Sequence, residues 1–340
     1  MSDRHTTIKT ILTETNQPQF RLDEITTAIY RDGISAWNKI PYLPKTLASA
    51  LSSTLFSTLT PVDTVSSPQA TKVLFATASG HQLESVLLSY KSSHTALCVS
   101  SQSGCALGCT FCATGAIGFK KNLTVDEILD QYLHFLRLGH KIDSIIFMGM
   151  GEPFANSEAV FSALTQLTTL CGLSPRRISV STVGLIPGIS RLTTDFPEVN
   201  LAYSLHSPFG DQRLSLMPVT KAYPIADVFT ALDNHISITN HKVFIAYLML
   251  VGVTDSLDHA QALGDLISSR PRPDLYHINL IRYNPASSKD KFQRSPANQI
   301  AAFTEILDKF HLHYTIRRDF GTSIAAACGQ LAGPYKATRI

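Results

Sequence analysis

Spaced apolar residues predict several short elements in the first ninety residues. Apolar positions three or four residues apart between Arg21 and Gly33 predict an amphipathic helix, and Pro44 begins a second helix. The Ser- and Thr-rich segment after it predicts a loop. Two runs with strand character, Lys72–Ala78 and Gln82–Tyr90, flank Ser79-Gly80-His81, which predicts a hairpin turn. We therefore expect an N-terminal module of helices plus a hairpin over residues 1–92.

From about residue 95, short apolar runs alternate with amphipathic stretches. The runs predict strands at Leu97–Ser101, Ser144–Met150, Ile178–Val183, Asn200–His206, Val243–Val251, Tyr276–Asn284 and Tyr314–Arg317. The stretches between them predict helices, among them Val125–Leu138, Ala226–His235, Leu257–Ser268 and Ala297–Phe310. This alternation is typical of parallel β/α units, so we expect an α/β fold with a complete or partial β/α barrel over residues 93–340. Functional residues of such barrels gather at the carboxyl ends of the strands.

Composition narrows the class of protein. Of the 340 residues, 44% are hydrophobic and 16% charged, so the chain can bury a large core. The formal net charge of +3 is too small to indicate a nucleic-acid partner. The polar start and the absence of a long apolar run predict neither a signal peptide nor a membrane span. Six cysteines are too few for a disulfide framework, so we expect a cytoplasmic protein with reduced thiols.

Three of the six cysteines stand close together, directly after the first strand of the expected barrel. Cys105, Cys109 and Cys112 have the spacing C-x₃-C-x₂-C on a glycine-containing loop, which lets three sulfur atoms converge. A structural zinc site and coincidence are the alternatives. Structural zinc takes four protein ligands, however, and no fourth Cys or His follows at finger-like spacing. Three thiolates suit a [4Fe–4S] cluster with one iron left open to bind a substrate.

This motif, with Phe111 before its last cysteine, resembles that of the radical S-adenosylmethionine (SAM) superfamily. The resemblance implies that the amino and carboxylate groups of SAM chelate the open iron. It also implies that an electron from the cluster cleaves SAM to a 5′-deoxyadenosyl radical, and that the fold is a partial β/α (radical-SAM) barrel.

Polar residues close several other predicted strands, where a barrel places its ligand contacts. The segment from Gly149 through Gly151 to Glu152 ends the second strand, as the superfamily's motif for the SAM amino group does. Its glycines let a ligand approach the backbone, and Glu152 can accept from an ammonium group. The remaining expected SAM-binding residues follow the third, fourth and sixth strands: Ser181, Ser204, Leu205, His206 and Asn284. Any one of them is equally well a satisfied loop residue, but together they favour a SAM site.

Two further cysteines lie far apart in the chain, and each alone would more often be a small buried hydrophobe. Cys328 in Ala-Ala-Cys-Gly-Gln-Leu and Cys98 in Cys-Val-Ser-Ser-Gln resemble motifs of the RlmN/Cfr family of rRNA adenine methyltransferases, and the similarity spans residues 70 to 332. The resemblance implies that one SAM methylates Cys328 and that the radical from a second SAM takes a hydrogen from this methyl group. The carbon radical then adds to the base, and Cys98 resolves the adduct as a transient Cys98–Cys328 disulfide. Cys171 matches no family motif, and we expect it to be structural.

A carboxylate in the hairpin is the last candidate. Glu84 falls where the family has a residue that contacts the target adenine and assists proton transfer. Spacing alone predicts instead an exposed hairpin charge.

Several details resemble the Cfr branch, which methylates adenine C8 in 23S rRNA and confers resistance to ribosome-targeting antibiotics. They include Leu-Gly-His-Lys-Ile-Asp-Ser from Leu138 and Leu-Ile-Arg-Tyr-Asn-Pro from Leu280, whereas Pro153 is typical of RlmN. An RlmN-type C2 methyltransferase of 23S rRNA and tRNA is the alternative. A non-catalytic metal- or RNA-binding protein is the third hypothesis. The family also implies a flavodoxin-type electron donor; we expect a monomer.

Basic residues follow several predicted strands and are candidates to contact RNA phosphates. The clusters are Lys120-Lys121, Arg176-Arg177, Arg270 and Arg272, Lys289, Lys291 and Arg294, Arg317-Arg318, and Lys336 and Arg339. We expect about half of them to be ordinary solvated charges.

Overall fold

The computed structural model describes residues 3–285, 291–317, 324 and 329–331. In these residues ten strands form one sheet in the order β1-β2-β3-β4-β7-β8-β9-β10-β11-β12. The strands of this sheet are β1 (Leu59–Ser67), β2 (Ala70–Thr77), β3 (Gln82–Ser89), β4 (Thr95–Cys98), β7 (Ser144–Phe147), β8 (Ile178–Thr182), β9 (Asn200–Ser204), β10 (Val243–Met249), β11 (Tyr276–Arg282) and β12 (His313–Ile316). A separate small hairpin consists of β5 (Gln102–Ser103) and β6 (Lys121–Asn122).

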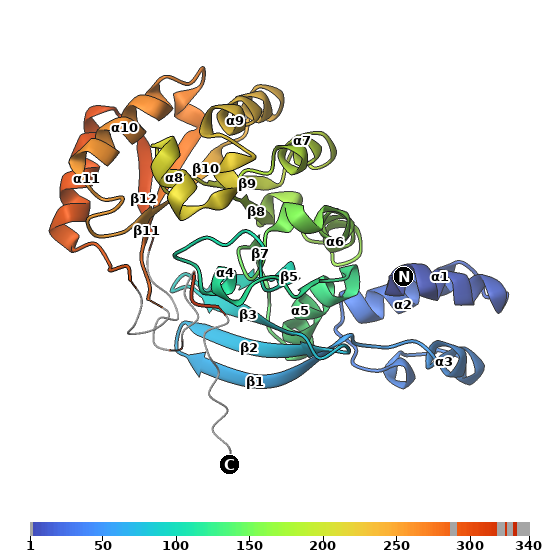
Figure 1. Cartoon of the computed structure of the whole chain (residues 1–340). Helices are drawn as coiled ribbons and strands as arrows, with labels where there is room; N and C mark the ends of the chain where they lie inside the picture. Colours follow the sequence, from blue (N-terminus) through green and yellow to red (C-terminus); the bar gives the residue numbers. More distant parts are fainter. Residues whose placement is uncertain (1–2, 286–290, 318–323, 325–328, 332–340) are drawn as a thin grey trace, which may run out of the picture.

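The strands from β4 onward are parallel to their neighbours, whereas β1 to β4 pair antiparallel. Helices that connect the parallel strands lie outside the curved sheet (Figure 1). They are α5 (Val125–Arg137), α6 (Ser157–Thr169), α7 (Ile186–Asp195), α9 (Ile225–Thr239), α10 (Leu257–Ser268) and α11 (Ala297–Lys309). The short helix α8 (Gly210–Leu216) lies instead at the carboxyl end of β9, where its Arg213 donates to the carbonyl of Ser204. The expectation of an α/β fold with a partial β/α barrel is confirmed.

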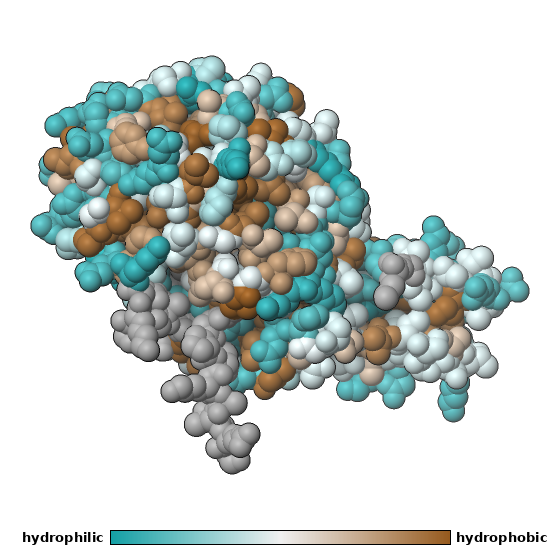
Figure 2. All heavy atoms as spheres, viewed as in Figure 1, coloured by the Kyte–Doolittle hydropathy of each residue, from teal (hydrophilic) through white to brown (hydrophobic). Residues whose placement is uncertain are grey.

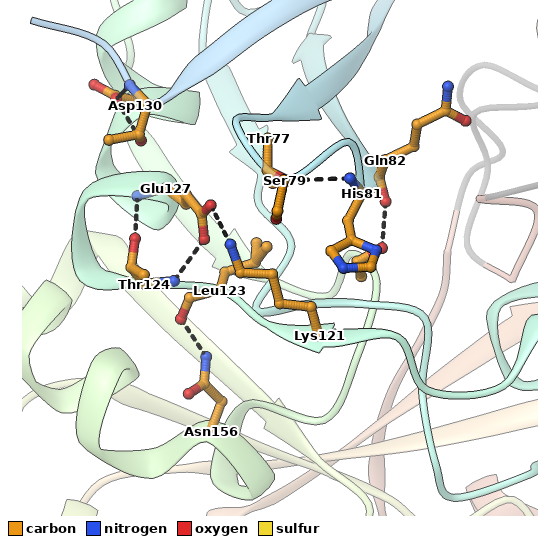
Figure 3. A network of polar contacts seen from close by, with 12 residues as sticks. Thr77, Ser79, His81, Gln82, Lys121, Leu123, Thr124, Glu127, Asp130 and Asn156 are labelled. Atoms are coloured by element: carbon orange, nitrogen blue, oxygen red, sulfur yellow. Dashed lines mark hydrogen bonds and ion pairs between the residues drawn. The ribbon is translucent and has the colours of Figure 1, made fainter. Parts of the chain in front are cut away.

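The helix α5 shows how local sequence sets these elements. Thr124 accepts a hydrogen bond from the backbone N–H of Glu127, and the Glu127 side chain accepts from the N–H of Thr124, which closes a capping box. Lys121 of the small hairpin donates to the same carboxylate at 2.5 Å, and the Nδ2 of Asn156 donates to the carbonyl of Leu123 at 2.8 Å (Figure 3). The loop before α5 is therefore held at both ends, and α5 lies against the sheet through its apolar face.

The N-terminal helices α1 (Arg4–Glu14), α2 (Phe20–Tyr30) and α3 (Lys45–Leu51) project from one side of the molecule (Figure 1). Arg4 anchors them, because its Nη2 lies 2.7 Å from the Asp130 carboxylate of α5 and both side chains are buried. The sheet continues across residue 92, since Val86 of β3 pairs with Cys98 of β4. The division of the chain into modules 1–92 and 93–340 stays a prediction.

One sequence-based expectation is wrong. The Ser- and Thr-rich segment after α3, predicted to be a loop, contains strand β1, which pairs antiparallel with β2. Most of its residues are exposed or half-buried, because β1 lies at the edge of the sheet. It therefore lacks the apolar alternation that marks a half-buried strand.

Within the described residues, no helix combines the length and the apolar content needed to cross a lipid bilayer. Hydrophilic residues cover much of the outer helices, while hydrophobic residues gather in the middle of the face that carries α8 (Figure 2). Two large apolar side chains at α8, Phe209 and Leu214, are each 41% exposed.

Candidate active site

The three clustered cysteines lie on the loop between β5 and α4 (Ala113–Ile117). This loop turns sharply at Gly104, whose φ is +73°; a Cβ there would lie 1.9 Å from the carbonyl oxygen of Gly118. The N–H of Cys112 donates to the carbonyl of Cys109 at 3.2 Å, and the N–H of Thr110 donates to that of Leu216 at 3.0 Å. The loop is thus fastened both to itself and to the end of α8.

The thiols of this loop are chemically suited to a positively charged group. Burial raises the pKa of Cys105 to about 11 and that of Cys109 to about 12, and repulsion from Cys112 adds to both shifts. The Cys105 and Cys109 thiols therefore become thiolates only when a positive centre stabilises them, as the irons of a [4Fe–4S] cluster do. In the described part of the chain, no three His, Cys, Asp or Glu side chains are grouped closely enough to hold a single metal ion. The donor set fits the cluster, because three thiols on one loop leave one of four irons without a protein ligand.

Glu152 lies behind this loop, at the end of β7. Its Oε1 accepts from the Thr182 hydroxyl at 2.7 Å, and its Oε2 accepts from the N–H of Val183 at 3.0 Å. Burial raises the pKa of this carboxyl to about 7, although these hydrogen bonds lower it in part. The N–H of Glu152 donates to Gln102 at 2.9 Å. Gly151 allows this contact, because a Cβ there would lie 2.5 Å from the Cβ of Gln102.

The predicted residues at the ends of β8 and β9 lie side by side. The hydroxyls of Ser181 and Ser204 are 3.5 Å apart. His206 follows Leu205, and the rings of His206 and Phe111 meet edge to face at 5.0 Å, which brings β9 against the cysteine loop. The Nδ1 of His206 accepts from the N–H of Leu248 at 3.1 Å, so this ring carries its proton on Nε2. Burial and a nearby arginine lower its pKa to about 3, which keeps the ring neutral.

That arginine is Arg213 of α8, which the sequence analysis did not identify. Its side chain is fully buried and donates to the carbonyls of Val183, Ser204 and Leu205 and to the hydroxyl of Thr220. Its positive charge opposes the effect of burial on the pKa of the Cys109 thiol. No periodic or motif signal distinguishes this position, because a single Arg in a short helix is usually exposed.

A cavity of about 570 Å³ opens inside the sheet and is lined by Cys98 and Asn284, two residues that the sequence analysis predicted. Cys98 is the last residue of β4 and is buried. The cavity is also lined by two arginines of the last strands, Arg282 and Arg317. It therefore places the expected resolving thiol in a space that has cationic side chains along its wall.

The segment after Cys328 is attached to the helix that follows the cysteine loop. The N–H of Ala113 donates to the carbonyl of Gly329 at 3.0 Å, and the hydroxyl of Thr114 donates to that of Leu331 at 3.1 Å. Leu331 also lines the cavity. Cys328 itself lies outside the described residues. The next residue, Gly329, is hydrogen-bonded to Ala113, which directly follows Cys112 in the chain.

Glu84 is not the exposed hairpin charge that spacing alone predicts, because its residue is only 1% exposed. Its Oε1 lies 3.0 Å from the Nζ of Lys72 on the neighbouring strand, and this lysine is buried as well. Along β3, Glu84 shares one face with Val86 and Leu88, which line the cavity. The carboxylate is thus on the side of the strand that faces the cavity.

Several of the basic residues proposed to contact RNA have carboxylate partners instead. Within the described residues, these ion pairs are Lys121–Glu127, Arg176–Glu198, Arg270–Asp233 and Arg272–Asp274. Which of the basic residues contact RNA stays a prediction. Arg317 differs, because it lines the cavity.

Comparison with known proteins shows the protein family to which this chain belongs. The Radical SAM superfamily model matches residues 99–263. The chain is 47% identical over 336 residues to the ribosomal RNA large subunit methyltransferase Cfr of Staphylococcus warneri, which covers 97% of this chain and 96% of that protein. The chain belongs to the Cfr family of radical SAM methyltransferases.

Two more comparisons support membership in the Cfr family. A protein of the same name from Bacillus velezensis is 46% identical over 341 residues, which is 98% of this chain and 97% of that protein. The crystal structure of a radical SAM methyltransferase from Sphaerobacter thermophilus superposes with a TM-score of 0.91 at 36% identity, over 97% of this chain and 98% of that one.

Membership in the Cfr family makes the protein an enzyme, so the hypothesis of a non-catalytic binding protein is wrong. The family implies a [4Fe–4S] cluster and SAM, and the cysteines of the C-x₃-C-x₂-C motif are present to hold the cluster. The family predicted from the sequence is therefore confirmed.

Proposed function

We propose that this Cfr-family enzyme methylates C8 of an adenine in 23S rRNA and thereby confers resistance to ribosome-targeting antibiotics. The observation that carries the proposal is the identity of 47% to proteins named Cfr over 97% of the chain. An enzyme that acts on ribosomal RNA works in the cytoplasm, with a reducing partner of the flavodoxin type as electron donor.

Cys105, Cys109 and Cys112 hold the cluster in this proposal, and Glu152, Ser181 and Asn284 belong to the residues that hold SAM. Together, the cluster and SAM supply a 5′-deoxyadenosyl radical. The polar residues at the ends of β7, β8, β9 and β11 orient SAM, because the carboxyl ends of parallel strands meet at one edge of the sheet. The remaining members of this SAM-binding set are Gly151, Ser204, Leu205 and His206.

Cys328 carries the methyl group in this proposal, and Cys98 attacks its sulfur to release the methylated base. Two observations support the pairing: Cys98 lines the cavity, and residues 329 and 331 bind the helix that follows Cys112. Before this step the radical adduct must lose one electron, which returns to the oxidised cluster, and the proton on the substituted ring carbon, which a base accepts. The S–C bond of the resulting closed-shell adduct then breaks as the Cys98–Cys328 disulfide forms, and its electron pair goes to the methylene carbon, which takes up a proton. Reduction of this disulfide by a cytosolic thiol returns the enzyme to its starting state.

Glu84 assists proton transfer at the adenine in this proposal. The buried Lys72 holds its carboxylate on the cavity side of β3, which fixes where the proton is accepted. The adenine itself must leave the stacked RNA to reach the cavity.

The regiochemistry is tested by mass spectrometry of 23S rRNA from cells that express the enzyme. We expect one added methyl group on an adenine, with fragment ions and chromatographic retention that match an 8-methyladenosine standard. A match to 2-methyladenosine would instead establish the RlmN-type reaction, which Pro153 after Glu152 favours. Unmodified rRNA in these cells would contradict both.

A further inference from the structure

Arg213 is a buried cation in the candidate active site whose hydrogen bonds all go to neutral groups. Its Nε donates to the carbonyl of Leu205 at 3.0 Å, and its Nη1 donates to the hydroxyl of Thr220 at 2.7 Å. Its Nη2 donates to the carbonyls of Val183 at 2.7 Å and Ser204 at 3.0 Å. Four of the five N–H groups of the guanidinium are thus in use, so the side chain is fixed in place.

No carboxylate neutralises this charge among residues 3–285, 291–317, 324 and 329–331. The described ion pairs do not include Arg213, and the nearby carboxylate of Glu152 accepts from Thr182, Val183 and Phe154. A buried charge without a counter-ion is unfavourable, and proteins usually pair it. The hydrogen bonds to carbonyl groups only partly offset that cost, so the positive charge is still felt by its surroundings.

The helix that carries Arg213 contacts the cysteine loop. The last residue of α8, Leu216, accepts a hydrogen bond from Thr110, which stands between Cys109 and Cys112. Cys109 and Phe111 pack against the apolar cluster that includes Leu216 and Met217. Arg213 therefore sits on the element that holds the cysteine loop.

We propose that Arg213 is a positioning residue that raises the reduction potential of the iron–sulfur cluster by placing an unpaired positive charge beside the Cys109 side of its binding loop. Each electron that the cluster accepts adds negative charge to this pocket, and a fixed cation in a poorly polarisable interior favours the more negative state. The inference rests on the cluster expected in this family and is independent of which adenine carbon is methylated.

The direct test is a redox titration of the reconstituted protein without RNA, with the reduced cluster followed by electron paramagnetic resonance. We expect Arg213→Gln, which keeps hydrogen-bond donors but removes the charge, to lower the equilibrium constant for reduction at least tenfold. For a one-electron couple this is a negative shift of about 59 mV. Arg213→Lys keeps the charge and should stay within about threefold of the unmodified protein.

A matched pair at Thr220 makes the test independent of the fate of Arg213. Thr220→Asp places a carboxylate where Nη1 now finds a hydroxyl, so it neutralises Arg213 without removing it, whereas Thr220→Asn is similar in size and uncharged. We expect the equilibrium constant for reduction to be at least tenfold lower in T220D than in T220N.

The visible absorbance of the cluster per protein chain shows that each variant is loaded, and this readout does not depend on methyl transfer. If R213Q does not fold or does not bind a cluster, the Thr220 pair decides. Equal potentials in T220D and T220N, or an R213Q potential equal to that of the unmodified protein, would overturn the proposal. A shift in T220D of the expected sign supports it even if the methylated carbon proves to be C2.

Discussion

Two buried arginines differ in whether a carboxylate neutralises them: Arg4 at the N-terminal helices and Arg213 in the candidate active site. Arg4 of α1 lies 2.7 Å from the Asp130 carboxylate of α5, in the region where the N-terminal helices join the barrel. Arg213 of α8 donates only to carbonyl and hydroxyl groups in the described structure. The first charge is neutralised where it stands, as expected for a contact that holds two elements together. In our proposal the second charge acts on the iron–sulfur cluster. Mutations in the N-terminal region should therefore change mainly stability, and mutations at the candidate active site should change mainly function.

Replacing Cys328, the proposed methyl carrier, should produce the largest functional effect. We expect Cys328→Ala to abolish methyl transfer, a loss of at least about 10³-fold, because the transferred carbon has no carrier. The cluster absorbance and the urea unfolding midpoint should be unchanged. The measurement is incorporation of labelled methyl from SAM into an rRNA fragment, and sustained incorporation by C328A would show that another residue carries the methyl.

Replacing Cys98, the proposed resolving cysteine, should stop the reaction at a later stage. We expect Cys98→Ala to accumulate a covalent protein–RNA adduct, since addition to the base precedes attack by Cys98. The adduct is visible as a slower band on a denaturing gel. Methylation at the normal rate without an adduct would assign resolution to a different thiol, and Cys171→Ala serves as the matched control because that cysteine matches no family motif.

In the N-terminal region the largest effect should fall on stability. Asp130 accepts from Arg4 and from the N–H and hydroxyl of Thr58. Asp130→Asn removes the carboxylate that is hydrogen-bonded to the buried Arg4 guanidinium and leaves Asp126 as the remaining nearby carboxylate, so we expect the free energy of unfolding to fall by about 3 kcal/mol. Urea unfolding measures this loss, and cluster binding by the folded fraction should be unaffected. The double variant with Arg4→Met should recover part of the loss, and failure to recover would mean that the hydrogen bonds to Thr58 dominate.

The same region should give a pH dependence. Burial raises the pKa of Asp126 from 3.8 to about 6, although its contact with Arg4 opposes this shift. The folded protein then binds more protons than the unfolded chain between about pH 4 and 6, so stability falls as the pH rises through this window. Asp126→Asn should remove this pH dependence, which amounts to a change in the free energy of unfolding on the order of 3 kcal/mol across the window. Urea unfolding at pH 4 to 7 measures the difference, and parallel curves for the two proteins would refute the assignment.

The smallest effect is expected at the surface. The Arg176–Glu198 pair is largely exposed, so Glu198→Gln should change the free energy of unfolding by less than about 1 kcal/mol. The same urea titration provides this reference. A loss as large as that of D130N would contradict the view that an ion pair contributes strongly to stability only where it is buried.

Sequence patterns predicted the barrel well because most of its strands are largely buried, as β10 is, although β12 is exposed or half-buried. The helix expected over Leu257–Ser268 has those bounds in the structure. Several strands end earlier than predicted, as β7 does at Phe147, because an apolar run does not show where backbone pairing stops. The edge strand β1 was missed because its polar residues face solvent.

In the candidate site, too, features that depend on local sequence were predicted, and contacts between separate elements were not. The cysteine motif and Glu152, which follows β7, were predicted, since their chemistry depends on residue type and short spacing. The contacts of Thr182 and Gln102 with Glu152 were not predicted, because they join elements far apart in the chain. The contact of Lys72 with Glu84 crosses a hairpin, and spacing alone did not show that this side of the hairpin is buried.

The sequence by itself determined the family, the cysteine motif proposed to hold the cluster and the order of β/α units, because these depend on local residue type and periodicity. Only the tertiary structure decided that Glu84 is buried against Lys72, that Cys98 and Asn284 line one cavity, and that Arg213 lies beside the cysteine loop. The physical reason is that desolvation and charge act through space, between residues that the chain brings together only when the sheet curves and its strand ends meet.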